Sequence, residues 1–241
     1  MTSYIFVLLV GMTAGAIGGI IGTGTSIMLL PVLVIAYGPK QAVPIMAVAA
    51  VMANLARVLA WWREVDWRAC AAYVLPGIPA AALGASTLLV LPANLIEIAL
   101  GLFFIVMVPV RHWLDKHHFR ISLWQLAVGG AVIGYLTGIV LSTGPLSVPL
   151  FLAYGLNKGA FLSTEAASSL FLYVSKTLTF RGLGAMPASI FVQGLIVGGS
   201  VMAGTFLGKS VVMRMRPSLF KHMLDALLLV SGVSMLWTAF A

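Results

Sequence analysis

Two glycine-rich stretches decide the fold of this 241-residue chain. The first is GAIGGIIGTGTSIMLLPVLVIAYG, residues 15–38, and the second is GYLTGIVLSTGPLSVPLFLAYG, residues 134–155. Both run in the same order through glycines, a Thr-Gly pair, a proline and a Tyr-Gly pair, although their alignment needs a short gap. This similarity predicts an internal repeat, with halves at residues 1–121 and 122–241 that form one integrated membrane domain.

The sequence around these stretches is too apolar for a soluble protein. Hydrophobic residues make up 61% of the chain and charged residues 8%, and the mean hydropathy is +1.08. Soluble domains carry about 25% charged residues. The composition therefore predicts an all-α, polytopic transmembrane protein, with the lipid bilayer as a partner and little chain left for domains outside it.

Glycine, proline and charge clusters divide the chain into apolar segments. We expect helices near residues 4–20, 27–37, 42–62, 70–90, 94–110, 122–141, 146–156, 160–178, 188–208 and 218–240. The segments 27–37 and 146–156 are too short to cross a bilayer, because a spanning helix needs about 20 residues. Each half is therefore predicted to contain a re-entrant or broken helix pair followed by three spanning helices.

The basic residues predict the orientation of these helices. The chain has 14 Lys and Arg against 6 Asp and Glu. If residues 4–37 form a re-entrant hairpin, the main basic loops share one side of the membrane, as the positive-inside rule requires: 62–69, 111–121, 157–159 and 209–217. A single broken crossing would instead place the last of these loops outside. The charges therefore favour inverted repeats with an outside N-terminus. Membrane orientation explains the excess of basic residues better than binding to a nucleic acid does.

The two breaks are also the predicted binding site. Unwound backbone is tolerated at membrane depth only where it lines a cavity or is buried in protein. The first N–H groups of a half-helix lack helical acceptors and carry the positive end of the helix dipole, so they favour a small anion. Glycine permits close approach and hydroxyl groups donate hydrogen bonds. The predicted binding residues are Gly22, Thr23, Gly24, Thr25, Ser26, Ser142, Thr143, Gly144 and Ser147.

Glycines at four-residue spacing also permit close helix packing in membranes. This interpretation is favoured for the pairs Gly11 and Gly15, Gly18 and Gly22, Gly134 and Gly138, and Gly204 and Gly208. Packing does not explain why each Thr-Gly pair precedes a helix that is too short to span. The breaks themselves are therefore assigned to ligand binding.

Four polar residues lie inside predicted helices, where each is costly unless it is partnered or functional: Asn54, Arg57, Glu165 and Lys176. Arg57 and Lys176 fall at nearly equivalent positions of the two repeats, which suggests a pair of cations flanking an anion path. The alternative is that both snorkel from helix ends to the membrane surface. Glu165 is a candidate proton-coupling carboxylate, or an ion-pair partner for a basic residue, or a residue that lies nearer the helix start than the predicted bounds place it. Asn54 joins the predicted binding set.

The sequence does not indicate an enzyme, because it contains neither H-E-x-x-H nor G-x-S-x-G. His112, His117 and His118 share a basic loop without a further ligand set, so we expect no metal site, and no cofactor is implied. The single cysteine, Cys70, excludes an intramolecular disulfide. It alone supports the alternative of a thiol-dependent membrane enzyme or assembly factor.

At these residues the chain resembles the sulfite exporter TauE/SafE family, also called the toluene sulfonate uptake permease family. The resemblance rests on residues 15–38, on REVDWR at residues 63–68 and on the second-half echo at residues 134–155. Two features depart from the family pattern: residues 25–26 are Thr-Ser where further glycines are common, and Pro145 lies in the second break.

The resemblance implies a secondary transporter that moves a small sulfur-containing anion, such as sulfite, sulfoacetate or another organosulfonate, by alternating access. Export is the expected direction, and the protein is expected to be a monomer or a homo-oligomer. An inside-negative potential favours expulsion of an anion by about 2.3 kcal/mol per charge per 100 mV, so export needs no coupled ion. The alternatives are an anion channel and a proton-coupled uptake permease, in which Glu165 would carry the proton.

Overall fold

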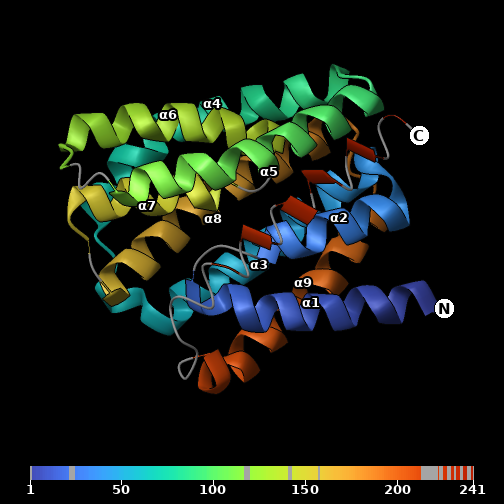
Figure 1. Cartoon of the computed structure of the whole chain (residues 1–241), viewed down its shortest axis with the longest axis horizontal. Helices are drawn as coiled ribbons and strands as arrows, with labels where there is room; N and C mark the ends of the chain where they lie inside the picture. Colours follow the sequence, from blue (N-terminus) through green and yellow to red (C-terminus); the bar gives the residue numbers. More distant parts are fainter. Residues whose placement is uncertain are drawn as a thin grey trace.

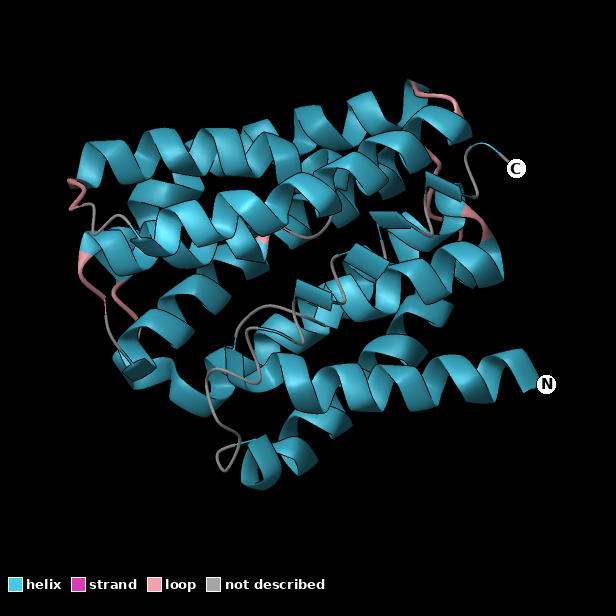
Figure 2. Ribbon diagram, in the orientation of Figure 1, coloured by secondary structure: helices cyan, strands magenta, loops and turns pink. Residues whose placement is uncertain are grey.

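A computed structural model confirms that the chain is helical. It describes residues 2–21, 25–116, 120–140, 143–156 and 158–212, and positions 222, 225–226, 229–230, 232–233, 236–237 and 240 near the C-terminus. These residues form helices and short connections, with no strand among them (Figure 2). Three stretches are long and apolar enough to cross a membrane: Lys40–Leu59, Trp67–Val90 and Ala188–Leu207. The chain is therefore a multi-pass membrane protein.

The helices match the predicted segments, as Figure 1 shows. They are α1 (Thr2–Ile21), α2 (Thr25–Tyr37), α3 (Pro39–Trp61), α4 (Trp67–Val90), α5 (Ala93–Lys116), α6 (Leu123–Val140), α7 (Gly144–Tyr154), α8 (Lys158–Gly182) and α9 (Ala188–Val212), with the 3-10 turn η1 (Trp62–Glu64) after α3. The segment predicted at 218–240 lies largely outside the described residues. The 13 residues of α2 and the 11 of α7 confirm that both helices are short. They extend about 20 and 17 Å, against about 30 Å of hydrocarbon.

The Tyr-Gly pairs of the two stretches end the two short helices. Gly155 follows α7 in a left-handed conformation, with φ of 105°. Gly38 separates α2 from α3 with φ of 75°. Glycine adopts a positive φ without the steric penalty of a side chain, so it stops each short helix and lets the chain turn into the next one.

The helices form two groups. One contains α1, α2, α3 and α9, and the other contains α4, α6, α7 and α8, while α5 contacts α3 of the first group and α6 and α7 of the second (Figure 1). The groups meet chiefly where α3 packs against α8. Each group holds helices from both halves of the sequence, because α9 joins the first three helices and α4 joins the second half. The two halves of the chain are therefore interleaved.

The two central helices, α3 and α8, run antiparallel. Arg57, near the end of α3, contacts Glu165, near the beginning of α8. Just beyond η1, the Asp66 backbone N–H donates to Thr164 Oγ1 at 2.9 Å. About 67% of the Lys40–Leu59 stretch of α3 is buried within the protein, against 39% of α4. Polar side chains on α3 and α8 are therefore held in the interior.

Glycines bring neighbouring helices into close contact in both groups. A Cβ atom at Gly138 of α6 would lie 2.5 Å from the Ala81 carbonyl oxygen of α4. One at Gly15 of α1 would lie 2.1 Å from the Val201 carbonyl oxygen of α9. These contacts confirm the packing interpretation for the described glycines of the four-residue pairs: Gly11, Gly15, Gly134, Gly138 and Gly204.

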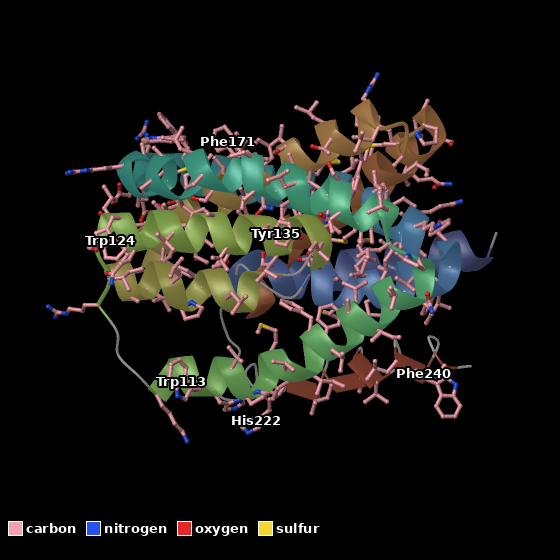
Figure 3. All side chains as sticks on the ribbon, turned by 90° about the horizontal axis from the view of Figure 1, so that it is seen from above. Trp113, Trp124, Tyr135, Phe171, His222 and Phe240 are labelled. Atoms are coloured by element: carbon pink, nitrogen blue, oxygen red, sulfur yellow. The ribbon has the colours of Figure 1, made fainter. Side chains whose placement is uncertain are left out.

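Exposed tryptophans mark the ends of several helices. Trp62 and Trp67 flank the connection between α3 and α4, and Trp113 and Trp124 lie near the end of α5 and the start of α6. Figure 3 shows Trp113 and Trp124 toward the same end of the molecule. Tryptophan is enriched at membrane–water interfaces, because its ring is amphipathic. This end of the molecule therefore fits a membrane boundary.

We predict that Gly138→Ala destabilises the protein, because the new methyl group would overlap the backbone of α4. Overpacking of this kind costs about 1–3 kcal/mol. Gly199→Ala on α9 is the matched control, since no atom lies within 4 Å of a Cβ placed there. Thermal unfolding in detergent should show a lower melting temperature for Gly138→Ala alone. Equal melting temperatures would contradict the close contact of α4 with α6.

Candidate functional site

The four polar residues predicted inside helices are all buried in the protein. Asn54 and Arg57 on α3 are 3% and 8% exposed, and Glu165 and Lys176 on α8 are 2% and 0% exposed. A snorkelling side chain extends its charged end to the surface. The snorkelling interpretation of Arg57 and Lys176 is therefore wrong.

Arg57 is held by an ion pair and by an amide. Its Nη1 atom lies 2.9 Å from Glu165 Oε2, and its Nη2 atom donates to Asn54 Oδ1. Asn54 Nδ2 in turn donates to the Ala50 carbonyl oxygen at 2.8 Å. Asn54 thus orients the guanidinium group, and Glu165 is an ion-pair partner, one of the alternatives that the sequence left open.

The second oxygen of Glu165 accepts two further hydrogen bonds. Ser147 Oγ, on α7, donates to Glu165 Oε1 at 3.1 Å. Ser169 Oγ, one turn further along α8, donates to the same oxygen at 2.8 Å. Together with Arg57, donors from three helices converge on one carboxylate. Charge-assisted hydrogen bonds of this kind are about twice as strong as neutral ones.

Lys176 has no comparable partner among the described residues. Its Nζ atom donates to the Thr137 carbonyl oxygen of α6 at 2.7 Å and lies 5.4 Å from the centroid of the Phe180 ring. No described carboxylate lies within 4.0 Å of Nζ. A carbonyl group in the last turn of a helix and an aromatic face both attract a cation, but neither neutralises its charge.

The first turn of α7 lies between these two charged groups. Thr143, which precedes α7, has its Oγ1 atom 2.5 Å from Thr137 Oγ1, and the Thr137 carbonyl oxygen accepts from Lys176. Ser147, one turn further along α7, donates to Glu165. The amino end of α7 is therefore connected by hydrogen bonds to both charged residues: to Glu165 through Ser147, and to Lys176 through Thr143 and Thr137.

The amino end of α7 offers fewer free N–H groups than the sequence suggested. The backbone N–H groups of Leu146 and Ser147 both donate to the Thr143 carbonyl oxygen at 2.9 Å. Pro145 has no N–H group. The Thr143 hydroxyl group donates to Thr137 Oγ1, because Thr137 Oγ1 itself donates to the Ile133 carbonyl oxygen at 2.7 Å. This end of α7 therefore offers chiefly the positive end of the helix dipole and the backbone at Gly144.

The amino end of α2 also reaches α8. Thr25 Oγ1 donates to the Ala14 carbonyl oxygen of α1 at 3.2 Å. A side-chain hydrogen bond joins Ser26 to Tyr173, which lies one turn before Lys176 on α8. The structure thus brings the amino ends of both short helices to α8. The other predicted binding residues lie outside the described residues: Gly22, Thr23, Gly24 and Ser142.

Three residues of this cluster were not among the predicted site residues. Ser169 follows Glu165 by four residues in the same small polar run, a spacing that places both on one helix face. Tyr173 lies three residues before Lys176, again on one face. Thr137 contributes its carbonyl oxygen, and side-chain identity gives no signal for a backbone group.

Ionisable side chains inside a multi-pass helical protein mark pathways for ions or substrates. The fold and the buried charges therefore define the class as a membrane transport protein. The sequence matches the family described as Sulfite exporter TauE/SafE over residues 7–235, and the chain belongs to that family. Membership confirms the recognised resemblance and the prediction that this protein is a transporter rather than an enzyme.

Two bacterial proteins are similar over most of their length. "Probable membrane transporter protein YjnA" of Bacillus subtilis (strain 168) is 23% identical, with 95% of this chain and 98% of that protein aligned. "Probable membrane transporter protein y4hK" of Sinorhizobium fredii (strain NBRC 101917 / NGR234) is 27% identical, with 72% and 73% aligned. No solved structure matches the chain.

We predict that breaking the Arg57–Glu165 pair destabilises the fold more than removing it altogether. Arg57→Met and Glu165→Leu should each cost about 3–5 kcal/mol, because each leaves one buried charge without a partner. The double variant should recover most of that loss. The measurement is thermal unfolding of all three proteins in detergent, and losses that simply add in the double variant would contradict the pairing.

Proposed function

We propose that this protein is a secondary transporter of a small sulfur-containing oxoanion, such as sulfite or an organosulfonate, bound beside Lys176. One observation carries the proposal: Lys176 is fully buried, and no described carboxylate neutralises it. Burying an unpaired charge costs several kcal/mol. A bound anion would remove that cost, and membership of the Sulfite exporter TauE/SafE family supports a sulfur-containing one.

The short helices would supply the remaining contacts. The amino end of α7 carries a partial positive charge and lies near Lys176, so the helix end and the lysine would both attract an anion. Thr143 at this end, and Thr25 and Ser26 at the amino end of α2, carry hydroxyl groups that can donate to sulfur-bound oxygens once they turn away from their present hydrogen-bond partners. Gly144 permits close approach of backbone to ligand. The neighbouring residues of the two breaks belong to the proposed site as well: Gly22, Thr23, Gly24 and Ser142.

We further propose that the two halves are inverted repeats that alternate access to this site. Three observations support it. The equivalent helices α3 and α8 are antiparallel, and Arg57 and Lys176 occupy the same position counted from the first residue of each helix. The pairing of α1 with α9 corresponds to that of α6 with α4. The two helix groups then provide the bodies that rock about the contact between α3 and α8.

Export from the cytoplasm of a bacterial cell, across its inner membrane, is the proposed direction. The basic loops would face inward under the positive-inside rule, and the inside-negative potential drives an anion outward. The bacterial origin of both relatives supports this location.

The test of function is flux of labelled sulfite, sulfoacetate and ethanesulfonate in proteoliposomes. We expect saturable flux of at least one anion, and a loss of about 10- to 100-fold in affinity for Lys176→Met, equivalent to a charge-assisted contact of about 1.5–3 kcal/mol. The melting temperature of Lys176→Met should stay the same or rise, since the variant removes an unpaired buried charge.

Lys40→Met is the matched control, because Lys40 is exposed at the start of α3 and should change neither affinity nor flux. Absence of flux and of binding for all three anions would contradict the proposed function. Conductance without saturation would identify an anion channel instead.

The inverted topology predicts which positions face outward. In a Cys70→Ser background, single cysteines replacing Lys40 and Arg181 should react with an impermeant maleimide added outside intact cells. Cysteines replacing Arg68 and Arg120 should react only after the membrane is opened. All four positions are exposed. Labelling of all four from the same side would rule out the inverted arrangement.

A further inference from the structure

The Glu165 carboxylate occupies a donor set that would also fit an oxoanion. Arg57 donates to one of its oxygens at 2.9 Å, and Ser147 and Ser169 donate to the other at 3.1 and 2.8 Å. The guanidinium group is a planar fork that matches the oxygens of carboxylate and other oxoanions. A sulfite or sulfonate group offers the same kind of acceptor, with negatively charged oxygens on one centre.

We propose that, in the absence of substrate, the Glu165 carboxylate occupies a position that the transported anion binds. The substrate enters the Arg57 site by displacing the Glu165 carboxylate, and Glu165 takes up one proton as it leaves. This inference rests on the proposed function and deepens it, because it assigns a second position on the anion path and makes binding there depend on one proton.

Charge balance is the reason for the proton. An ionised Glu165 that left Arg57 would be a buried carboxylate without a partner, which costs several kcal/mol. A proton from water, added to one carboxylate oxygen, removes that charge. Before the exchange the site holds the Arg57 cation and the Glu165 anion. After it, the site holds the Arg57 cation, a substrate anion and a neutral Glu165. For a monovalent anion, the net charge is unchanged.

No other described group around Glu165 can take the place of Arg57 as its charged partner. Tyr73 of α4 and Tyr173 of α8 also lie near Glu165, but a phenol group is a far weaker acid than a carboxyl group. Lys176 lies three turns along α8, about 16 Å away at 1.5 Å per residue. The helices α6 and α7 contain no charged residue. Among the described residues, Arg57 is therefore the one charged partner of Glu165.

Two other carboxylates, those of Asp66 and Glu64, lie near the beginning of α8 but make contacts of their own. Asp66 accepts hydrogen bonds from the backbone N–H groups of Arg68 and Ala69 and so caps α4. Glu64 is exposed in η1, and its carboxylate lies against Gly159 at the start of α8. Glu64 thus offers a matched control, since it is a carboxylate beside the same helix but outside the hydrogen-bonded cluster.

The exchange makes anion affinity depend on pH. If one proton binds with each anion, the apparent affinity falls as the pH rises, by up to about tenfold per pH unit. Ethanesulfonate and sulfoacetate are suitable probes, because carboxyl groups titrate near pH 4 and sulfonates lower still, so the charge of both anions is constant between about pH 6 and pH 8. Any pH dependence then belongs to the protein.

The experiment measures the dissociation constant of each probe, and of sulfite with its own titration subtracted, across this pH range. A pH dye in weak buffer reports proton uptake on anion addition. The parent protein should take up about one proton per molecule at saturating anion, when the Arg57 position is filled as well as the one beside Lys176. Glu165→Gln should show little pH dependence and no proton uptake, since an amide neither titrates nor carries the charge that holds Arg57. Glu64→Gln should behave like the parent.

Anion binding by the parent protein without proton uptake would overturn the inference and leave the proposed function intact. An equal change of anion affinity with pH in Glu165→Gln and in the parent protein would also overturn the inference and leave the proposed function intact. If Glu165→Gln does not fold, Glu165→Asp should keep the slope, and the proton count of the parent still decides. If none of the three anions binds the parent protein, the proposed function itself fails.

Discussion

A charge inside a membrane protein needs a compensating charge, because neither lipid nor apolar side chains can solvate it. Arg57 meets this requirement through Glu165, and their contact ties α3 to α8 where the two helix groups meet. Lys176, on the same α8, has a carbonyl oxygen and an aromatic ring nearby but no described carboxylate. Arg57 is thus paired with a carboxylate of the protein itself, whereas Lys176 is not paired with any described carboxylate. The proposed transport mechanism follows from that difference.

The positions of the helices could be predicted because they depend on local properties of the sequence. The length of an apolar run decides whether a helix can span, and glycine and charge mark where it stops. The same reasoning predicted that α2 and α7 are short. The structure adds the physical reason for the repeated Tyr-Gly pairs, since Gly38 and Gly155 both have positive φ at the ends of these helices. The cost of intramembrane charge likewise directed attention to Arg57, Glu165 and Lys176.

The partners of these residues could not be predicted, because they depend on tertiary packing. Arg57 and Glu165 are 108 residues apart and meet only because α3 and α8 run antiparallel. Glycine spacing predicted close packing of α6, but it carried no information that α4 would be the neighbour. The number of free N–H groups at α7 was overestimated for a local reason, since Leu146 already donates to Thr143 and Pro145 has no N–H to offer.

The central claim is that an anion binds beside Lys176, between the amino ends of α2 and α7. The most direct measurement is a crystal structure with selenite, in which selenium replaces the sulfur of sulfite and is located by its anomalous scattering. We expect an interior selenium peak beside Lys176, with the selenite oxygens within hydrogen-bond distance of Lys176 Nζ, about 2.7–2.9 Å. An interior without a peak, with selenium only at exposed basic loops such as that of Arg120, would contradict the claim.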